Sequence, residues 1–371
     1  MNIAIIRSEC SFRKGGAERY AANLCGTLAE MGHRVMVLAE KFDPEIHPAL
    51  IHIPIQVNRS SSWARNRSFN VNSQRELKKL KVDAVFALSR SFPSDAFRVS
   101  DPLHRFWMEI RYPGKIHRFL QSLNPRHRAI LQLEKAILDP ANTRMIVTNS
   151  ELSKKIIREY YQYPADRIHV VYNGVDHSQF SVSDRERARD EKSHLLFVGQ
   201  DFKRKGLRPV IEALAAARKA GCDCDLRVIG RDKTKPYEEL AQSLGVRNFV
   251  NFEGPTKAIQ EAYREADLFV FPTFYDPFAN VCLEALACGL PVLTTTTNGA
   301  SELIREGLDG YVIDGKNADA FSNSITEKIK AFCRLTARER SEMRSAARAK
   351  AENFTVGRNA LAIAGLLSKK S

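Results

Sequence analysis

Short apolar runs alternate with helical patterns along this chain, and that alternation constrains its fold more than any other feature. Apolar residues recur at helical spacing within 17–31, which predicts a helix. Strands are expected around it at 3–6, 35–39, 82–88 and 145–148. A second series predicts strands at 195–198, 226–229, 268–271, 291–294 and 311–313, and helices at 207–219, 236–244, 257–265, 279–288 and 318–333. This order predicts parallel sheets, and therefore an α/β fold of two Rossmann-like, doubly wound domains.

The two series meet at the turn-forming segment Asn173-Gly-Val-Asp176. We expect domains at 1–172 and 177–350, and a helix within 351–371 that packs back on the first domain. Ligands of doubly wound sheets bind at the carboxyl ends of the strands. If the two sheets face each other, the site lies in a cleft between the domains.

The charge balance predicts an anionic partner. Lys and Arg number 57 against 43 Asp and Glu, a formal net charge of +14. Nucleic acid, an anionic membrane surface and phosphorylated small molecules are the candidate partners. No uncharged run reaches the about 20 apolar residues of a membrane-spanning helix. Arg7 interrupts the run 3–6, so we expect no signal peptide and a cytoplasmic protein.

The seven cysteines are expected to be free thiols. Cys25, Cys282 and Cys288 fall on the apolar faces of expected helices, where thiols behave as small hydrophobic groups. Cys222 and Cys224 form a Cys-x-Cys pair without a second pair, so we expect no zinc site there.

Asp276 and Glu284, with seven residues between them, are the strongest candidate site residues. Asp276 is expected in the loop after the strand 268–271. Glu284 is expected inside a helix that Gly289 ends. That helix has one other polar residue, Asn280, four positions earlier and so on the same face.

A carboxylate in an otherwise apolar helix needs a partner, because burying it unpaired is costly. The same helix offers the amides of Ala279, Asn280 and Val281 to an anion. Carboxylates beside such amides favour a nucleotide-sugar, which has hydroxyls at two places and phosphates between them. The alternative for Glu284 is a structural carboxylate satisfied by backbone or by a nearby arginine.

The loop 199–206 places Lys203, Arg204 and Lys205 at an expected helix N-terminus, where the helix dipole opposes positive charge. A diphosphate held by Arg204 and Lys205 would resolve that conflict. The alternative is three solvated cations on a surface loop.

Two further segments bear on the site. The loop 7–16 is long for its place, which suggests function, and Gly15-Gly16 allow a close backbone approach. Glu18, in the first turn of the next helix, serves either a ligand or the helix dipole. Asp223-Cys-Asp225 resembles the metal-binding pair of manganese-dependent sugar transferases, but it precedes the strand 226–229 and so lies away from the ligand edge. We expect no essential metal.

The segment 104–120 interleaves four aromatic residues with four Arg or Lys against a single acid. This composition favours an anionic membrane interface. Nucleic acid could use it too, but no nucleic-acid motif accompanies it. A solvated basic face with its aromatic side chains in the core is the third interpretation. The expected membrane contacts are Arg105, Trp107, Arg111, Lys115 and Arg118.

Several motifs together resemble the retaining glycosyltransferases with two facing Rossmann-like domains, the GT-B architecture. The Asp-x7-Glu element resembles their E-x7-E motif. The other matches, in family order, are Gly15-Gly16-Ala-Glu18, Val171-Tyr-Asn-Gly-Val-Asp176, Lys205-Gly206 and Leu283-Glu-Ala-Leu-Ala-Cys-Gly-Leu-Pro-Val292. Ser100-Asp-Pro-Leu-His104, the basic aromatic segment after it and 199–206 are similar to the branch that builds lipopolysaccharide core, in particular to glucosyltransferases acting on an inner-core heptose.

The resemblance implies a role for each matching residue. Glu284 would hold the ribose hydroxyls, Asp276 a donor-sugar hydroxyl, and Arg204 with Lys205 the leaving diphosphate. The amides 279–281 and Gly15-Gly16 would approach the phosphates or the acceptor. Contacts with donor sugar or acceptor would come from His104, Asp101 and Glu18.

The resemblance further implies hexose transfer from UDP-glucose to a lipopolysaccharide core sugar, with retention and without a metal, at the cytoplasmic face of the inner membrane. The alternatives are a transferase for another cell-surface glycan, a nucleotide-sugar epimerase or glycoside phosphorylase on the same scaffold, and a non-catalytic binder of nucleic acid or anionic lipid. Three residues depart from the family pattern. Asp276 replaces a Glu, Gln200 stands where many relatives have Arg, and Pro102 replaces a common Gly.

Overall fold

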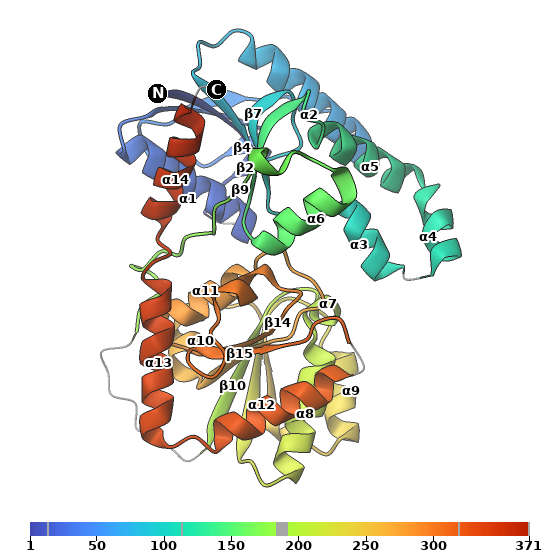
Figure 1. Cartoon of the computed structure of the whole chain (residues 1–371), viewed down its shortest axis with the longest axis vertical. Helices are drawn as coiled ribbons and strands as arrows, with labels where there is room; N and C mark the ends of the chain where they lie inside the picture. Colours follow the sequence, from blue (N-terminus) through green and yellow to red (C-terminus); the bar gives the residue numbers. More distant parts are fainter. Residues whose placement is uncertain (13–14, 113, 183–191, 318–319, 370–371) are drawn as a thin grey trace. The chain divides into compact units, whose positions relative to one another are not determined.

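The computed structural model describes residues 1–12, 15–112, 114–182, 192–317 and 320–369, which divide into two units (Figure 1). The first unit comprises Met1–Asn173 together with Val356–Ser371, and the second comprises Gly174–Thr355. The expected loop 7–16, helix 318–333 and segment 351–371 each include residues outside the described ranges.

The first unit is built on a parallel sheet of seven strands in the order β5-β3-β1-β6-β7-β8-β9. The four strands expected from the sequence are present, and β5, β7 and β9 are additional. The strands are β1 (Asn2–Ile6), β3 (Arg34–Ala39), β5 (Ile51–Pro54), β6 (Ala84–Ala87), β7 (Ser94–Val99), β8 (Thr143–Thr148) and β9 (Ile168–Val170), beside a separate pair β2 (Glu9–Cys10) and β4 (Lys41–Phe42). Its α-helices are α1 (Gly16–Glu30), α2 (Ser62–Leu77), α3 (His104–Arg111), α4 (Lys115–Ser122), α5 (Pro125–Ile137), α6 (Glu151–Tyr161) and α14 (Val356–Ser368).

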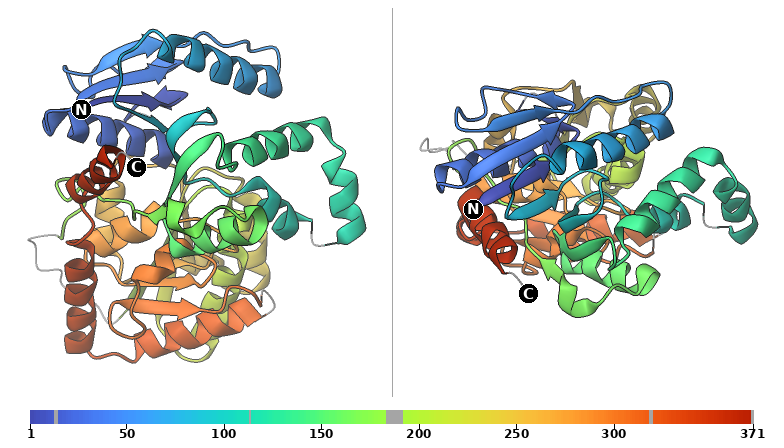
Figure 2. Two further views of the ribbon diagram at one scale, coloured as in Figure 1. Left: turned by 45° about the horizontal axis from the view of Figure 1, so that its top comes forward. Right: turned by 90° about the horizontal axis from the view of Figure 1, so that it is seen from above.

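Both faces of this sheet are buried, as is typical of parallel sheets. Ile3 and Ile5 of β1 belong to an apolar cluster with α1 and α14, whereas Ala4 and Ile6 belong to a second cluster with Phe69 of α2. Figure 2 shows α14 lying beside α1, and Ile363 and Leu367 of α14 are buried in the first cluster. The last helix therefore completes the core of the first unit.

The second unit has a parallel six-stranded sheet in the order β12-β11-β10-β13-β14-β15. The five strands expected from the sequence are present, together with β12. The strands are β10 (Ser193–Val198), β11 (Cys224–Ile229), β12 (Val250–Glu253), β13 (Leu268–Phe271), β14 (Val292–Thr295) and β15 (Gly310–Ile313). The α-helices are α7 (Phe202–Lys205), α8 (Leu207–Lys219), α9 (Lys235–Ser243), α10 (Ile259–Glu265), α11 (Asn280–Ala287), α12 (Phe321–Cys333) and α13 (Ala337–Ala351).

The chain passes between the units twice, at 173–174 and at 355–356. The two passages run side by side, since the Val175 amide donates to the Phe354 carbonyl at 2.9 Å and Val175 forms a parallel bridge with Thr355. On the side of the first unit, Asn359 Nδ2 donates to the Tyr172 carbonyl at 2.7 Å. Both connections are therefore held in place by hydrogen bonds.

No α-helix among the described residues is long and apolar enough to cross a membrane.

Candidate functional site

Asp276 lies in the loop between β13 and α11, at the carboxyl edge of the second sheet, where the sequence predicts it. Its backbone is fixed to the loop after β14, because its amide donates to the Thr297 carbonyl at 3.1 Å and its carbonyl accepts from the Gly299 amide at 2.9 Å. Gly289, with φ of 68°, follows the end of α11 as expected. These bonds fix the backbone of Asp276, from which its carboxylate projects.

The three adjacent cations directly precede the long helix α8, as the sequence predicts, although they lie in a short helix and not in a loop. Lys203, Arg204 and Lys205 occupy the last turn of the separate short helix α7, and α8 starts only after Gly206. Gly206 has φ of 81°, and a Cβ there would lie 2.3 Å from the Pro272 carbonyl oxygen. This left-handed residue separates α7 from α8, and the three cations lie in the residues directly before the N-terminus of α8.

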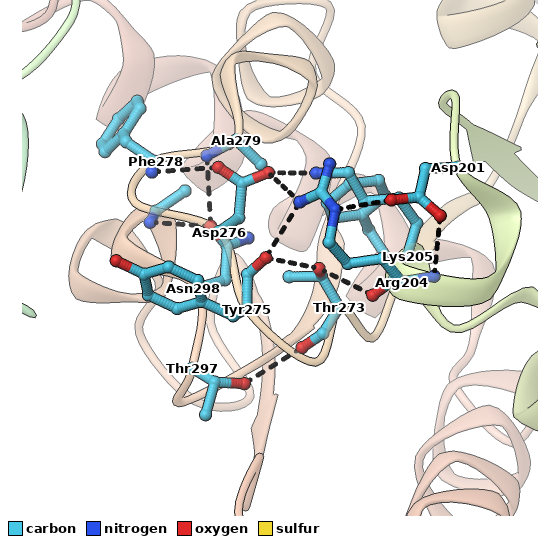
Figure 3. Close-up of polar contacts among 12 residues, drawn as sticks. Asp201, Arg204, Lys205, Thr273, Tyr275, Asp276, Phe278, Ala279, Thr297 and Asn298 are labelled. Carbon is cyan, nitrogen blue, oxygen red and sulfur yellow. Dashed lines mark hydrogen bonds and ion pairs between the residues drawn. The ribbon is translucent and has the colours of Figure 1, made fainter. Parts of the chain in front are cut away.

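Lys205 and Asp276 form a largely buried ion pair (Figure 3). The exposed fraction is 10% for the Lys205 side chain and 15% for that of Asp276. The other carboxylate oxygen of Asp276 accepts from the Phe278 amide at 3.1 Å. Of the three cations, only Lys203 is exposed, so the interpretation as three solvated cations is wrong.

Arg204 joins this pair to a second carboxylate. Its Nη1 lies 4.0 Å from Asp276 Oδ2 and donates to the Tyr275 carbonyl at 3.1 Å. Its Nε donates to Asp201 Oδ2 at 2.8 Å. Two cations and two carboxylates therefore meet at one sheet edge, in what we call the Lys205–Asp276–Arg204 cluster with Asp201 at its rim (Figure 3).

The Ala279 amide, one of the three expected to face an anion, is occupied. The Ala279 amide donates to Asn298 Oδ1 at 3.1 Å, and the Ala300 amide donates to the same oxygen. Asn298 is fully buried and also donates to Thr294 Oγ1 at 2.9 Å. Asn298 was not among the sequence candidates, although its place three residues after the end of β14, at the ligand edge, could have drawn attention to it.

Glu284 is half-buried in α11 and accepts a hydrogen bond from the Tyr263 hydroxyl, at 3.1 Å from Oε2. Tyr263 is fully buried, and burial together with the Glu284 charge raises the pKa of its phenol well above the ordinary value. Its hydroxyl therefore remains a donor that orients the carboxylate. One partner of Glu284 is therefore a tyrosine, which was not expected from the sequence.

In the first unit, Gly15 and Gly16 are exposed at the start of α1. Glu18 forms an ion pair with Arg7, whose Nη2 lies 3.0 Å from Oε1. Arg7 is 7% exposed, and its Nη1 donates to the Leu88 carbonyl at 2.8 Å. Glu18 therefore forms an ion pair with Arg7 in addition to its favourable position at the helix N-terminus.

His104 begins α3 and lies among aromatic rings. Its Nε2 is hydrogen-bonded to His127 Nδ1 at 2.9 Å, and its ring stacks on that of Trp107. Burial, with a smaller contribution from the His127 charge, lowers the pKa of His104 to about 4. His104 is therefore neutral at neutral pH.

Glu134 of α5, which was not among the sequence candidates, anchors the start of α3. This buried carboxylate accepts from the backbone amides of His104 and Arg105 and from the Tyr161 hydroxyl. Burial raises the pKa of Glu134. Asp101 is exposed and lines a cavity of about 210 Å³ in the same unit, with Arg7, Arg90 and Arg98.

Helices α3, α4 and α5 form an arm that projects from the rest of the first unit (Figure 2). Trp107 is half-buried between His104 and Tyr112, and Arg105 and Arg111 lie against tyrosine rings. Lys115 is exposed, and Arg118 faces Glu109. The exposed apolar side chains of the arm are instead Ile110, Ile116, Phe119, Leu120 and Leu123, and no residue of α4 is buried.

Asp223 and Asp225 lie at the amino end of β11, away from the cluster. Asp223 pairs with Arg218, and Asp225 pairs with Lys192 and His194. Among the residues that the structure describes, His, Cys, Asp and Glu side chains form no group of three suited to a metal ion.

Two parallel-sheet α/β units with charged residues at the carboxyl edge of the second sheet define the class, which is the glycosyltransferases with the GT-B fold. The model "Glycosyl transferases group 1" matches 179–350, and "Glycosyltransferase Family 4" matches 14–179. Together the two models cover 14–350, and the chain is a glycosyltransferase. It carries both halves of the GT-B fold.

Individual relatives agree with this assignment. The chain is 28% identical over 332 residues to lipopolysaccharide glucosyltransferase WaaG of Escherichia coli K12, covering 86% of each chain. It is 32% identical to a D-inositol 3-phosphate glycosyltransferase of Arthrobacter, over 52% of this chain and 48% of that one. The crystal structure of WaaG superimposes with a TM-score of 0.82 at 24% identity, covering 99% of this chain and 100% of that one. Anabaena HepE in complex with UDP-glucose superimposes with a TM-score of 0.71 at 18% identity, covering 99% of each. At these identities the two structures bear on the fold alone.

Proposed function

We propose that the chain is a retaining hexosyltransferase that moves glucose from UDP-glucose to a heptose, or another sugar, of lipopolysaccharide core. The observation that carries the proposal is the Lys205–Asp276–Arg204 cluster at the carboxyl edge of the second sheet, where sheets of this type bind ligands. The likeness to a protein named lipopolysaccharide glucosyltransferase supports the choice of sugar and acceptor.

In this proposal the cluster stabilises the leaving group. Negative charge develops on the diphosphate as its bond to the anomeric carbon breaks, and Arg204 and Lys205 supply fixed positive charge to it. The Asp276 carboxylate holds Lys205 Nζ in position before the donor arrives. The amides of Asn280 and Val281 are further candidates for the diphosphate, but that of Ala279 is not, since it donates to Asn298.

In the same proposal, the carboxylates of Asp276 and Glu284 bind hydroxyl groups of the donor. Asp276 accepts from a hydroxyl of the sugar, and Glu284 accepts from the ribose hydroxyls. Tyr263 orients Glu284 for that purpose through its buried hydroxyl. Because both Asp276 oxygens already accept a bond, the sugar hydroxyl uses a remaining lone pair of that carboxylate.

The first unit supplies the acceptor side. Gly15, Gly16 and Glu18 are candidate contacts at the start of α1, and Asp101 and His104 are candidates at the start of the arm. A neutral His104 accepts or donates a hydrogen bond to a sugar hydroxyl without adding charge. The exposed apolar face of α4 and the basic residues around it support peripheral binding at the cytoplasmic face of an anionic membrane.

The test begins with a screen of UDP-, GDP- and ADP-sugars, with and without EDTA, in which thermal stabilisation and release of nucleoside diphosphate are measured. The proposal predicts that UDP-glucose gives the largest stabilisation and slow release of UDP, and that EDTA changes neither. Lipopolysaccharide truncated after its inner-core heptoses is then the acceptor, and the anomeric configuration of the product is read by NMR.

Three other results would each decide against part of the proposal. A change in the free sugar nucleotide without transfer would indicate an epimerase. Transfer to inositol phosphate or to another glycan, and not to core heptose, would replace the acceptor. Absence of any response to nucleotide-sugars would overturn the assignment of the donor site.

A further inference from the structure

Three cysteines that are far apart in sequence come together in the second unit, at the sheet edge opposite the Lys205–Asp276–Arg204 cluster. Cys224 begins β11, Cys222 lies two residues earlier, and Cys333 is the last residue of α12. Each of the three thiols interacts electrostatically with the other two. The sequence places Cys222 and Cys224 together, and the fold adds Cys333 as a third thiol.

This thiol cluster opens to solvent through a cavity of about 240 Å³. Cys222 and Cys333 both line it and are partly exposed, whereas Cys224 is fully buried behind them. Cys333 Sγ also lies 3.6 Å from the hydroxyl of Ser193, at the start of β10. A small molecule can therefore reach Cys333 without opening the core.

The surroundings of Cys333 favour its thiolate. Lys330 and Arg334 line the cavity, and Arg340 of α13 donates from Nη2 to the Cys333 carbonyl at 3.0 Å. Asp223 is the acid of the cavity, and it is paired with Arg218. Tyr311 also interacts with Cys333, and burial raises the pKa of its phenol, so it remains neutral.

The thiols themselves contribute most to this preference. The hydrogen bond from the Cys224 thiol lowers the pKa of Cys333 most, and the Ser193 hydroxyl and the Cys222 thiol add to it. Burial acts in the opposite direction, and the resulting pKa of Cys333 is about 6. The pKa of Cys222 and that of Cys224 are both raised, so these two remain thiols at neutral pH.

A thiolate that is accessible, surrounded by cations and adjacent to a second thiol has the features of a redox-active cysteine. We propose that Cys333 is a peroxide-reactive thiol whose oxidation ends in a disulfide bond to the Cys222–Cys224 pair. The reaction needs a hydroperoxide as oxidant. It is separate from glycosyl transfer, because β10 and β11 begin at this edge of the sheet and reach the cluster only at their other ends.

The chemistry takes two steps. The Cys333 thiolate attacks one peroxide oxygen, the O–O bond breaks, hydroxide leaves, and sulfur is oxidised to sulfenic acid. The neighbouring thiol then attacks the sulfenic sulfur, an S–S bond forms, and the hydroxyl group leaves as water with the thiol proton. We expect Cys222 to be the attacking thiol, because it lines the same cavity as Cys333.

Thiol labelling of the native full chain tests the first half of the proposal. Iodoacetamide labelling followed by peptide mass spectrometry should modify Cys333 first, with a pH midpoint near 6. Cys25, Cys282 and Cys288, each fully buried, serve as internal controls and should stay unlabelled. A Cys333 that reacts no faster at pH 7 than a cysteine of the unfolded chain would overturn the proposal.

Peroxide treatment tests the second half and requires no variant to begin with. Stoichiometric hydrogen peroxide should give an intramolecular disulfide between the peptides carrying Cys333 and Cys222, reversible by dithiothreitol. The C222S/C224S double variant should lose the disulfide and accumulate a dimedone adduct on Cys333, and C333S should lose both. Folded wild-type protein that yields neither a disulfide nor a dimedone adduct would refute the proposal.

Discussion

At the scale of single residues, the ion pair of Lys205 with Asp276 is the feature with the largest energetic consequence. Both side chains are largely removed from water, so each depends on the other for compensation of its charge. Removing one partner leaves the other charge buried and unpaired, which is costly. The same dependence holds a cation at the place where the proposed leaving diphosphate would bind.

We predict that Lys205→Met lowers transfer at least a hundredfold and destabilises the second unit by about 3 kcal/mol, the lower end for a broken buried pair. The Lys205→Met/Asp276→Asn double variant should regain part of the stability but none of the activity, because it leaves no unpaired charge. Denaturant unfolding and steady-state kinetics measure the two effects.

Lys203→Met is the matched control, since Lys203 lies in the same turn and is exposed. It should change stability by no more than about 0.5 kcal/mol and leave transfer close to wild type. Equal loss of activity in the Lys203 and Lys205 variants would show that the loop contributes only general positive charge.

His104 gives a prediction on pH. Its folded-state pKa of about 4 lies below the ordinary 6.5, so protonation is disfavoured in the folded protein. Stability from this residue is fully present above pH 6.5 and is lost as pH falls from 6.5 towards 4. NMR titration should show His104 neutral down to about pH 4, and His127→Gln should raise its pKa partway. A wild-type midpoint near 6.5 would contradict the burial that we describe.

A candidate residue was predictable where its residue type and its position within a single segment were enough to indicate a function. The sequence identifies Asp276 and Lys205 because they follow strands. It identifies Glu284 because it is a charged residue in an apolar helix. Their partners Asn298 and Tyr263 were missed, because each belongs to another element of the second unit. The loop expected at 199–206 contains the short helix α7, whose four residues are too few to show a helical periodicity.

At the scale of elements, the sequence predicts the central strands well and the others poorly. β1, β3, β10 and β13 are continuous apolar runs and stand out. β7 has the sequence SDAFRV, in which Asp95 and Arg98 interrupt the apolar pattern, so the strand is not evident from the sequence. In the structure it pairs with β6 and β8 within the sheet. Polar helices such as α2 and α13 were missed for the same reason, since few of their residues are buried.

Helix α4 carries the prediction at this scale. Ile116, Phe119 and Leu120 are 80%, 64% and 57% exposed. If they enter a membrane, their replacement by Ser should weaken binding to phosphatidylglycerol vesicles at least tenfold, since burial of each such side chain is worth roughly 2 kcal/mol. Vesicle co-sedimentation measures the effect.

Charge and apolar contact can be separated in the same assay. Neutralising Arg105, Arg111, Lys115 and Arg118 should weaken binding mainly at low salt, by about 1 kcal/mol for each residue near the surface. Leu361→Ser is the control, because Leu361 is 64% exposed but lies on α14, outside the arm. Unchanged binding of the α4 variant would remove membrane contact from the proposed function.

At the scale of the whole molecule, the first unit is discontinuous in sequence. Ile363 of α14 is 1% exposed in the core that β1 and α1 also form, while Leu361 of the same helix is 64% exposed. We predict that Ile363→Ala destabilises the first unit by about 3 kcal/mol and that Leu361→Ala changes stability by less than about 0.5 kcal/mol.

Unfolding of each variant, followed by hydrogen exchange with mass spectrometry, tests this prediction. Protection should fall in β1, β3 and α1 of the Ile363→Ala variant and remain unchanged in β10–β15. Equal loss of protection in both units would contradict the division that we describe, because it would mean that the chain unfolds as one cooperative block.

The return of α14 to the first unit has a consequence for how the chain is made. Synthesis proceeds from the amino end, so the strands of the first sheet leave the ribosome while the helix that covers them is still untranslated. At roughly 5–20 residues per second, translation of the intervening 174–355 takes roughly ten to forty seconds. During that interval the second unit can fold completely, whereas the first exposes the apolar surface that Ile363 and Leu367 later cover. The nascent amino-terminal half is therefore where we expect a chaperone to be needed.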